Sequence, residues 1–597
     1  MDNTTKNDQK KPLWQGLKLW QKLIAIAVLL IFAGSVLGYA VNTDFGKVQV
    51  KDMSFVTDSG VSIAGSLYIP DGASEENPAP AVVVQHGGNC NRETMSSFSV
   101  ELARRGYIVF NEEAWGNGYS DVNHNDDIPS TVYAVQYLSR LAIVDKACIG
   151  LIGHSAGAKQ VCQAAVYNDC EFGVRSVLVL GAGATDFTAE TPINLGLIIG
   201  YRDENHKTSR RVLTEDGNKE MFGTTEDIVD GQWYGSLEDH TARIMYNPEG
   251  VFHLMMRQHP GVIAKALDFF DTTYEHESAL STGNQIWWLK ELGSCLVFSA
   301  VILMIFAMIL LLPETELFGS VVSEECRPQV TRSKKLYIGI AIVALFSGLE
   351  LQNLFAGGVS LMPKISSAFQ LSLINGAVLW VFCMGLVMLL VNTIIKRTTK
   401  GYDFKEEAKV YTISPKNLGK TLVIAVFIFA LSLLITAVVQ EVTLGMHTKF
   451  LHPEFSVLNI ARLKMFALYL WPFLMGQLIS AYVQTTTYRT VGGSNRSFLL
   501  TTMFVNAIGL LIYLAIIMSM KSFGVSFGDG WLVQFLGLVS PKVRYNSIAL
   551  SIVMLSVVNS AITTVSYNKT KTIYLGSIIN AMLLTWMACG SVLGEVQ

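Results

Sequence analysis

Apolar positions along the chain follow two patterns, and the change between them falls near residue 286. From there onward apolar residues form long runs of about 20, the length that a helix needs to cross a bilayer. One further run, 23–41, lies near the N-terminus. The sequence therefore predicts nine membrane-spanning helices, one at 23–41 and eight at 289–312, 336–356, 369–395, 420–440, 465–485, 498–519, 548–566 and 572–593.

The run at 23–41 follows five lysines, as the apolar part of a signal sequence does. It is long for a cleavable signal, and no small-x-small cleavage motif follows it, so we interpret it as an uncleaved signal anchor. The chain then divides into four parts. These are an N-terminal segment (1–22), the anchor (23–41), a domain of soluble character (42–285) and a membrane domain with about eight helices (286–597).

Positive charges differ between alternate loops. The N-terminus and the loops 313–335, 396–420, 486–497 and 567–572 together hold 20 Lys and Arg, whereas the short loops between them hold 7. Cytoplasmic loops are enriched in these residues. We therefore expect a multi-pass protein of the cell membrane with a cytoplasmic N-terminus and an extracytoplasmic domain.

Within 42–285, short apolar runs alternate with helical patterns. An opening hairpin is predicted at 47–70, around the turn residues 58–60. Strands that alternate with helices indicate a mostly parallel sheet with helices on both faces, which is an α/β fold. The predicted strands after the hairpin are 79–85, 107–111, 148–153, 174–180, 195–200 and 242–247, and 261–270 is the closing helix.

The motif Gly153-x-Ser155-x-Gly157 lies between a predicted strand and a predicted helix. A very tight turn at this position strains the serine backbone and exposes its hydroxyl, and the small glycines leave room for the turn. An isolated Gly-x-Ser-x-Gly also occurs by chance in surface turns. Its place between strand and helix favours Ser155 as a nucleophile.

A serine hydroxyl needs a base and a group that orients the base. When a nucleophilic serine follows such a turn, the acid and then the histidine come later in the chain. Asp203, three residues after the strand at 195–200, is the preferred acid, with Glu204 and Asp186 as alternatives; any of the three could be a solvated loop carboxylate. His253 and His259 both precede the closing helix. We favour His253, because His259 directly precedes Pro260 and is typical of a helix start.

The oxyanion formed during attack requires backbone N–H donors. The amide of Ala156, directly after the nucleophile, is one candidate. The loop after the strand at 79–85 is the other, because its glycines allow the backbone to approach a substrate closely. Gly87, Gly88 and Asn89 fit this role, although the same residues could form a tight turn and no more.

Residues 47–275 resemble the α/β-hydrolase superfamily, most closely its dienelactone-hydrolase-like and prolyl-oligopeptidase-like members. This resemblance implies hydrolysis of an ester, thioester or amide through an acyl-serine, without a cofactor. The matching motifs are His86-Gly87-Gly88, Gly116-x-Gly118-x-Ser120, Gly153-x-Ser155-x-Gly157, Gly200-x-x-Asp203 and a histidine before Ala266-Leu267-Asp268-Phe269-Phe270.

Net charge and cysteine content limit the classes of partner that we expect for this protein. The net charge of −3 gives no indication of nucleic-acid binding, and the eight cysteines form no Cys-x-x-Cys pair that would suggest a metal site. We expect a small-molecule or lipid-derived acyl substrate and contact with membrane lipid. An alternative is a transporter or sensor whose hydrolase-like domain only binds a ligand. Glu350, inside a predicted span, is a candidate functional residue on that interpretation.

Overall fold

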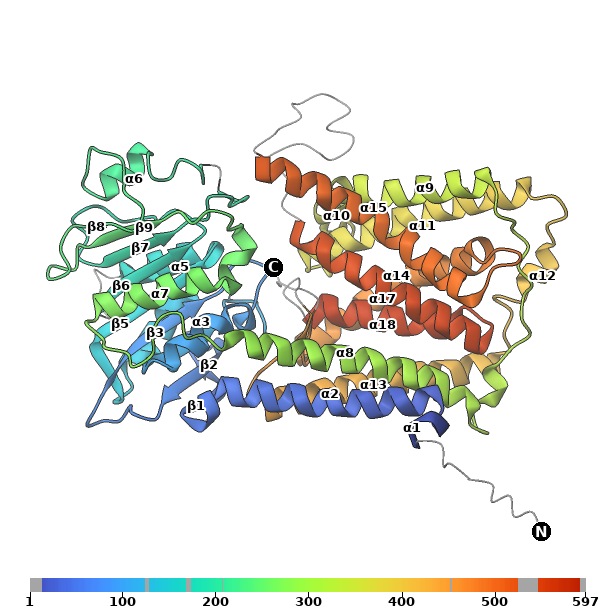
Figure 1. Ribbon diagram of the computed structural model, residues 1–597, viewed down its shortest axis with the longest axis horizontal. Coiled ribbons are helices and arrows are strands. Elements are labelled where there is room, and N and C mark those ends of the chain that lie inside the picture. Colours follow the sequence, from blue (N-terminus) through green and yellow to red (C-terminus); the bar gives the residue numbers. More distant parts are fainter. Residues whose placement is uncertain are drawn as a thin grey trace, which may run out of the picture.

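The computed structural model describes residues 13–123, 128–167, 173–206, 208–450, 454–523 and 546–590. Figure 1 shows a sheet with its covering helices at one end and a bundle of long helices at the other. The two parts meet along one edge of the sheet.

The sheet has nine strands in the order β1-β2-β4-β3-β5-β6-β7-β9-β8. The first two strands form the predicted antiparallel hairpin, β2 pairs antiparallel with β4, the strands from β4 through β9 pair in parallel, and β8 is antiparallel at the far edge. The strands are β1 Val48–Val56, β2 Ser62–Pro70, β3 Ala79–Gln85, β4 Ile108–Glu112, β5 Val144–His154, β6 Val174–Leu180, β7 Asn194–Ile198, β8 Trp233–Tyr234 and β9 Arg243–Tyr246.

Helices cover both faces of the sheet. Strand residues point alternately to the two faces, so Val83 of β3 packs in one core with α4 and α5, and Val82 packs in the other with α3 and α7. Both faces are therefore buried, as parallel sheets require. These four helices are α3 Ser96–Ala103, α4 Ser130–Ser139, α5 Ala156–Ala165 and α7 Pro260–Thr273.

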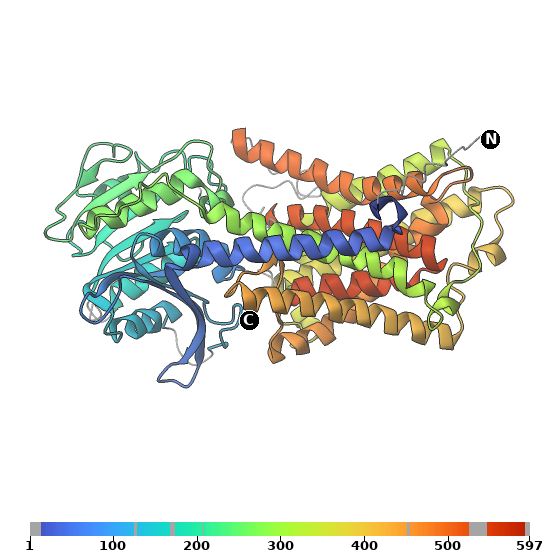
Figure 2. The same cartoon turned by 60° about the horizontal axis from the view of Figure 1, so that its bottom comes forward.

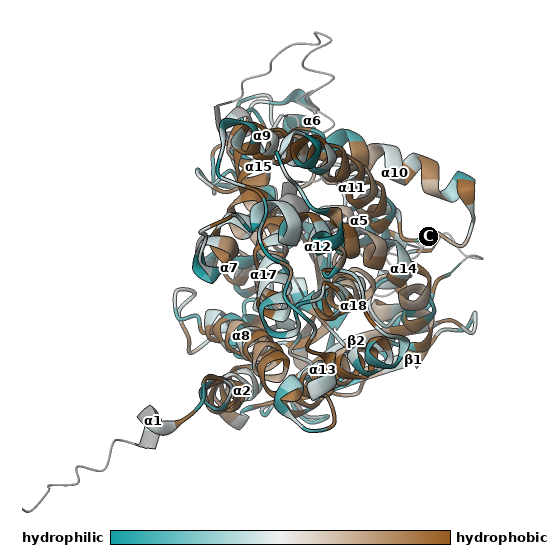
Figure 3. Cartoon of the chain, turned by 90° about the vertical axis from the view of Figure 1, so that its right-hand side faces the viewer, coloured by the Kyte–Doolittle hydropathy of each residue, from teal (hydrophilic) through white to brown (hydrophobic). Residues whose placement is uncertain are grey.

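The long helices form the second part. Seven of the described helices are long and apolar enough to cross a membrane, or eight if a bent pair counts as one span. Figure 3, viewed from the end away from the sheet, shows these helices largely in hydrophobic colours. The seven are α2 Leu19–Asn42, α8 Trp287–Leu311, α11 Ser372–Thr398, α13 Pro415–Val442, α14 Ile460–Val483, α15 Asn495–Phe523 and α17 Asn546–Thr570. The bent pair is α9 Lys334–Leu349 and α10 Leu351–Ile365, and the apolar helix α18 Tyr574–Gly590 is shorter, with 17 residues.

The predicted span 336–356 differs from the structure. Here the chain forms two helices, α9 and α10, which meet at an angle of 56° at Glu350. The Glu350 side chain accepts a hydrogen bond from Asn353 Nδ2 at 3.1 Å. The apolar run continues through Glu350 into α10, so the length of the run alone does not reveal the bend.

Helix α2 lies beside α8, and both lead into the sheet part (Figures 1 and 2). Gly34 and Gly293 allow the close approach: a Cβ on Gly34 would lie 2.5 Å from the carbonyl oxygen of Gly293. Small residues bring membrane helices together in this way. The sheet part is therefore attached at its start and at its end to a tightly packed helix pair.

Loops at the carboxyl edge of the sheet contact the helices and their connecting loops. Asn91, after β3, donates from Nδ2 to Glu454 at 2.7 Å, and Tyr119, after β4, donates from its hydroxyl to the Val457 carbonyl at 3.1 Å. Arg462 of α14 donates to the carbonyl oxygen of Gly116 at 3.2 Å. The carboxyl edge thus faces the helix bundle.

Candidate active site

Ser155 lies in the turn between β5 and α5 with φ 56° and ψ −114°. A non-glycine residue in this region is strained, and such strain concentrates at functional sites. Its backbone N–H donates to the Leu180 carbonyl at 2.9 Å, which fixes the turn against β6. The strand–turn–helix context predicted around the Gly-x-Ser-x-Gly motif is present.

The two glycines of the motif leave no room for a side chain. A Cβ on Gly153 would lie 2.5 Å from the Gly157 carbonyl oxygen, and one on Gly157 would lie 2.3 Å from the His86 carbonyl oxygen. Both distances are well below a van der Waals contact. The glycines therefore allow the tight turn and the approach of the loop after β3.

Asp203 and His253 come together, although 50 residues separate them in the chain. Asp203 follows β7, and His253 begins the 3-10 helix η4 (His253–Gln258) after β9. His253 Nδ1 lies 3.0 and 2.9 Å from the two carboxylate oxygens, and both side chains are buried. Asp203 Oδ1 also accepts backbone N–H bonds from Asn205 at 2.8 Å and His206 at 3.1 Å. A carboxylate with these bonds holds the imidazole in one tautomer and one orientation.

Gly181, directly after β6, makes this convergence sterically feasible. A Cβ there would lie 3.0 Å from the His253 ring and 3.1 Å from Asp203 Oδ2, and the residue has φ +66°. Its neighbour Leu180 accepts the hydrogen bond from Ser155. The acid–base pair therefore lies beside the serine. Within the described part of the chain, no hydrogen bond joins the Ser155 hydroxyl to the His253 ring, and such bonds are often long before a substrate binds.

The alternative candidates for the acid and for the histidine make other contacts or none of these. Glu204 accepts the backbone N–H of His253 at 2.8 Å, so it holds the loop instead of the ring. Asp186 is exposed at a left-handed position. His259 is the N-cap of α7, whose first residue is Pro260, as expected for a helix start.

The loop after β3 lies against the serine turn. A Cβ on Gly87 would lie 3.2 Å from Ser155 Cβ, and one on Gly88 would lie 3.5 Å from Ala156 Cβ. Asn89 has φ 54°, which turns the backbone at the next residue. The three predicted donor residues Ala156, Gly88 and Asn89 therefore lie at one place at the carboxyl edge, and Gly88 and Ala156 are exposed.

Two further histidines, His86 and His154, lie near the Asp203–His253 pair, and burial lowers the pKa of both. His86 Nδ1 lies 2.7 Å from the Gly87 carbonyl and Nε2 accepts the Ala114 N–H at 3.1 Å, so only Nδ1 carries a proton. Burial, with a smaller contribution from Arg257, lowers the pKa of His86 to about 4. Burial also lowers the pKa of His154, whose Nε2 lies 3.1 Å from the His253 carbonyl. The His154 ring lies 4.6 Å from that of His253.

Charged residues are buried where the loop after β3 meets the helices. Glu93 pairs with Lys290 of α8 at 3.0 Å, and Lys449 bridges Glu93 at 3.9 Å and Glu291 at 3.0 Å. Burial alone would raise the pKa of Glu93, but the two lysines outweigh it and hold that pKa below its ordinary value. Buried charges that are fully paired fix geometry. The loop that carries Gly88 and Asn89 is therefore held against the membrane domain.

Comparisons with known proteins match only part of the chain. No protein-family model matches the chain. A protein of Escherichia coli K12 described as "Uncharacterized protein YcjY" is 25% identical over 185 residues, which cover 29% of this chain and 54% of that protein. The chain therefore spans about half the length of this curated relative.

Similar solved structures cover a similar share of the chain. Est1E from Butyrivibrio proteoclasticus, solved with ferulic acid, is 15% identical with a TM-score of 0.29 and covers 37% of this chain and 99% of its own. The hypothetical protein PA2218 from Pseudomonas aeruginosa is 13% identical with a TM-score of 0.30, covering 39% and 94%. The dienelactone hydrolase-like phosphotriesterase P91 from metagenomic libraries is 14% identical with a TM-score of 0.27, covering 39% and 99%.

The order of strands defines the class of this domain. A sheet ordered β1-β2-β4-β3-β5-β6-β7-β9, with helices on both faces and a Gly-x-Ser-x-Gly turn after β5, has the α/β-hydrolase fold. This sheet domain is joined to a set of apolar helices that fits a multi-pass membrane protein.

Proposed function

We propose that the protein is a membrane-tethered, extracytoplasmic serine hydrolase that cleaves an ester, thioester or amide through an acyl-serine intermediate. The observation that carries this proposal is the Asp203–His253 pair, held at 2.9 Å beside the strained Ser155. A domain that only bound a ligand would not need a buried carboxylate–imidazole pair next to a strained, partly buried serine.

Each residue then has a defined task. Ser155 Oγ attacks the acyl carbon and passes its proton to His253 Nε2, while the charge of Asp203 stabilises the imidazolium. The carbonyl oxygen becomes an oxyanion, which accepts N–H bonds from Ala156 and from the Gly88–Asn89 backbone. His253 returns the proton to the leaving group. Water then releases the acyl group by the same steps and regenerates the Ser155 hydroxyl.

The proposed side of the membrane follows from charge. The loops rich in Lys and Arg lie at the helix ends away from the sheet, where Lys18 and Lys569 both pair with Glu314, at 3.1 and 2.7 Å. Such loops are cytoplasmic, so this arrangement supports an extracytoplasmic hydrolase domain. Because the carboxyl edge of the sheet faces the helices, a small or lipid-derived acyl substrate would reach Ser155 close to the outer membrane surface.

A fluorophosphonate probe that does not cross membranes tests both parts of the proposal. Fluorophosphonates phosphonylate serines that have an activated hydroxyl. We expect intact cells that express the full chain to show one labelled band, with the phosphonyl group on Ser155. Ser155→Ala should abolish labelling, whereas Ser139→Ala, at the end of α4, should leave it unchanged.

Two results would contradict the proposal at different points. If a permeant probe also fails to label the folded protein, Ser155 is not an activated nucleophile. If the permeant probe labels Ser155 and the impermeant one labels it only after lysis, the hydrolase domain lies in the cytoplasm.

A further inference from the structure

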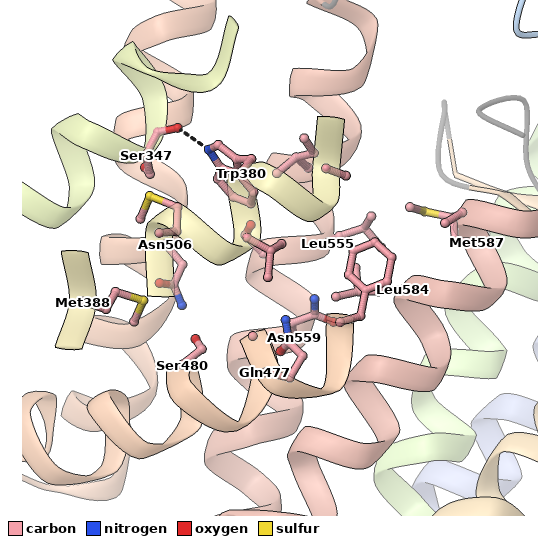
Figure 4. A pocket seen from close by; sticks show the side chains of 18 of the residues that line it. Ser347, Trp380, Met388, Gln477, Ser480, Asn506, Leu555, Asn559, Leu584 and Met587 are labelled. Atoms are coloured by element: carbon pink, nitrogen blue, oxygen red, sulfur yellow. Dashed lines mark hydrogen bonds between the residues drawn. The ribbon is translucent and has the colours of Figure 1, made fainter. Parts of the chain in front are cut away.

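A pocket lies inside the membrane domain, among α9, α10, α11, α14, α15, α17 and α18 (Figure 4). None of its lining residues belongs to the hydrolase domain. Its cavity volume is about 130 Å³. An engineered cavity of about 150 Å³ holds benzene, so this pocket has room for part of an organic molecule. It is therefore a candidate ligand site separate from Ser155.

The wall of the pocket is mostly apolar and carries no charge among the described residues. Methionines from α11 and α18 contribute flexible side chains that adapt to irregular ligands. The absence of Asp, Glu, Lys, Arg and His from this lining makes it a poor environment for an ion. Apolar side chains of the wall include Leu373, Met384, Met388, Leu555, Leu584 and Met587.

Four amides interrupt this apolar wall. Asn506 donates to Ser560 Oγ at 2.7 Å, and Gln484 donates to Ser480 Oγ at 2.7 Å, but Gln484 Oε1 is buried without a partner. Gln477 and Asn559 point into the pocket (Figure 4). Within the part of the chain that the structure describes, their side chains have no hydrogen-bond partner.

Unpartnered amides are costly at this depth. Gln477 lies within the span Ile460–Tyr488 and Asn559 within Leu550–Thr570, away from their ends. Hydrocarbon offers no hydrogen bonds, so a polar group there needs a protein, water or ligand partner. Another asparagine nearby shows the ordinary arrangement: Asn375 of α11 accepts from the Tyr469 hydroxyl at 2.6 Å and donates to the Phe369 carbonyl at 2.9 Å.

We propose that this pocket binds an uncharged single-chain acyl or alkyl lipid, whose ester, ether or hydroxyl oxygens bond with Gln477 and Asn559. The apolar wall surrounds the chain of the lipid, and the two amides supply both donors and acceptors for its oxygens. The absence of charge in the wall selects a neutral head over a carboxylate or a phosphate. Binding does not require hydrolysis at Ser155.

A photoreactive alkylglycerol tests the proposal directly. The probe carries a diazirine and an alkyne in its chain, and its ether bond cannot be cleaved by a serine hydrolase. We expect irradiation of the full-length protein in nanodiscs to place the probe on pocket residues of α11, α14 or α17. Unlabelled alkylglycerol should compete, and Ser155→Ala should leave the labelling unchanged, so that this result is independent of the proposed enzymatic activity.

Two matched substitutions separate ligand binding from structure. Asn559→Leu removes an unpartnered amide at similar volume, so we expect an unchanged or higher Tm and about tenfold weaker labelling. Asn375→Leu makes the same chemical change at a paired amide and should lower Tm. Tm is measured without the probe, and labelling is measured over a range of probe concentrations.

Three outcomes would overturn the proposal. The first is labelling spread over lipid-facing residues without competition, which means that water alone fills the pocket. The second is Asn559→Leu with a Tm as low as that of Asn375→Leu, which assigns Asn559 to the structure. The third is equal labelling by an anionic fatty-acid diazirine, which removes the preference for an uncharged lipid.

Discussion

The sheet edge and the membrane pocket differ in how far the hydrogen bonds of their polar side chains are satisfied. At the sheet edge, both Asp203 oxygens contact His253, and two backbone amides complete the shell. In the pocket, the side chains of Gln477 and Asn559 have no hydrogen-bond partner within the described chain. A site whose groups are already paired is preorganised for chemistry. A site with unpaired amides gains those hydrogen bonds only when something binds.

The largest expected effect comes from breaking the paired site. Asp203→Asn keeps the shape but removes the charge that orients His253, so we expect kcat for a p-nitrophenyl ester to fall by about 10⁴. Glu204→Gln keeps an acceptor for the His253 N–H and should cost far less. Equal losses in the two variants would mean that Asp203 does not orient the base.

A smaller loss of kcat should follow when the Asp203–His253 pair is displaced while both residues are kept. Gly181→Ala places a Cβ 3.0 Å from the His253 ring at a left-handed φ, and misplacement of this kind costs about 100-fold in kcat. Gly183 has open space around it, so Gly183→Ala is the control and should retain activity. If both variants are fully active, the His253 position seen here is not the one used in catalysis.

The buried charges at the domain contact should matter for stability more than for chemistry. Glu93→Leu leaves Lys290 without its paired carboxylate and leaves Lys449 with Glu291 alone. Breaking a buried pair in this way costs about 3 kcal/mol. Asp216→Asn disrupts an exposed pair with Lys219 and should leave Tm unchanged. A Glu93→Leu protein as stable as the original would show that the two domains do not depend on this contact. Thermal unfolding of the purified full chain measures both.

The smallest expected effect, taken per pH unit, is a dependence of stability on pH. Burial raises the pKa of Glu112 from 4.5 to about 8. Between these values the folded state binds more protons than the unfolded state, so stability falls as pH rises, by at most about 1.4 kcal/mol per pH unit. Glu112→Gln should flatten the plot of Tm against pH between 4.5 and 8. An unchanged slope would place the responsible group elsewhere.

Local sequence patterns predicted much of the sheet and little of its long-range contacts. The Gly-x-Ser-x-Gly turn, the hairpin and the helix start at His259 depend on neighbouring residues, and the structure has each of them. Asp203 and His253 were expected from chain order, and they lie together. Gly181 leaves room for them because the ends of three strands meet at one edge of the sheet. No local sequence pattern shows that these strand ends meet.

The membrane domain was predictable in a different way. Its helices follow from the length of apolar runs, but the bend at Glu350 and the partners of each amide depend on how the helices pack. Asn375 and Asn559 are alike in the sequence, and only the structure shows that the first is paired and the second faces a pocket. The contact between Asn91 and Glu454 joins residues 363 apart, beyond the reach of periodicity.

Trapping the acyl intermediate shows whether Ser155 is the nucleophile. The purified full chain is mixed with a p-nitrophenyl ester, quenched in acid within the first turnover, digested and examined by mass spectrometry. We expect the peptide containing Ser155 to gain the mass of the acyl group, and Ser155→Ala to gain none and not to turn over. Turnover by Ser155→Ala at the original rate, or an acyl group on another residue, would contradict it.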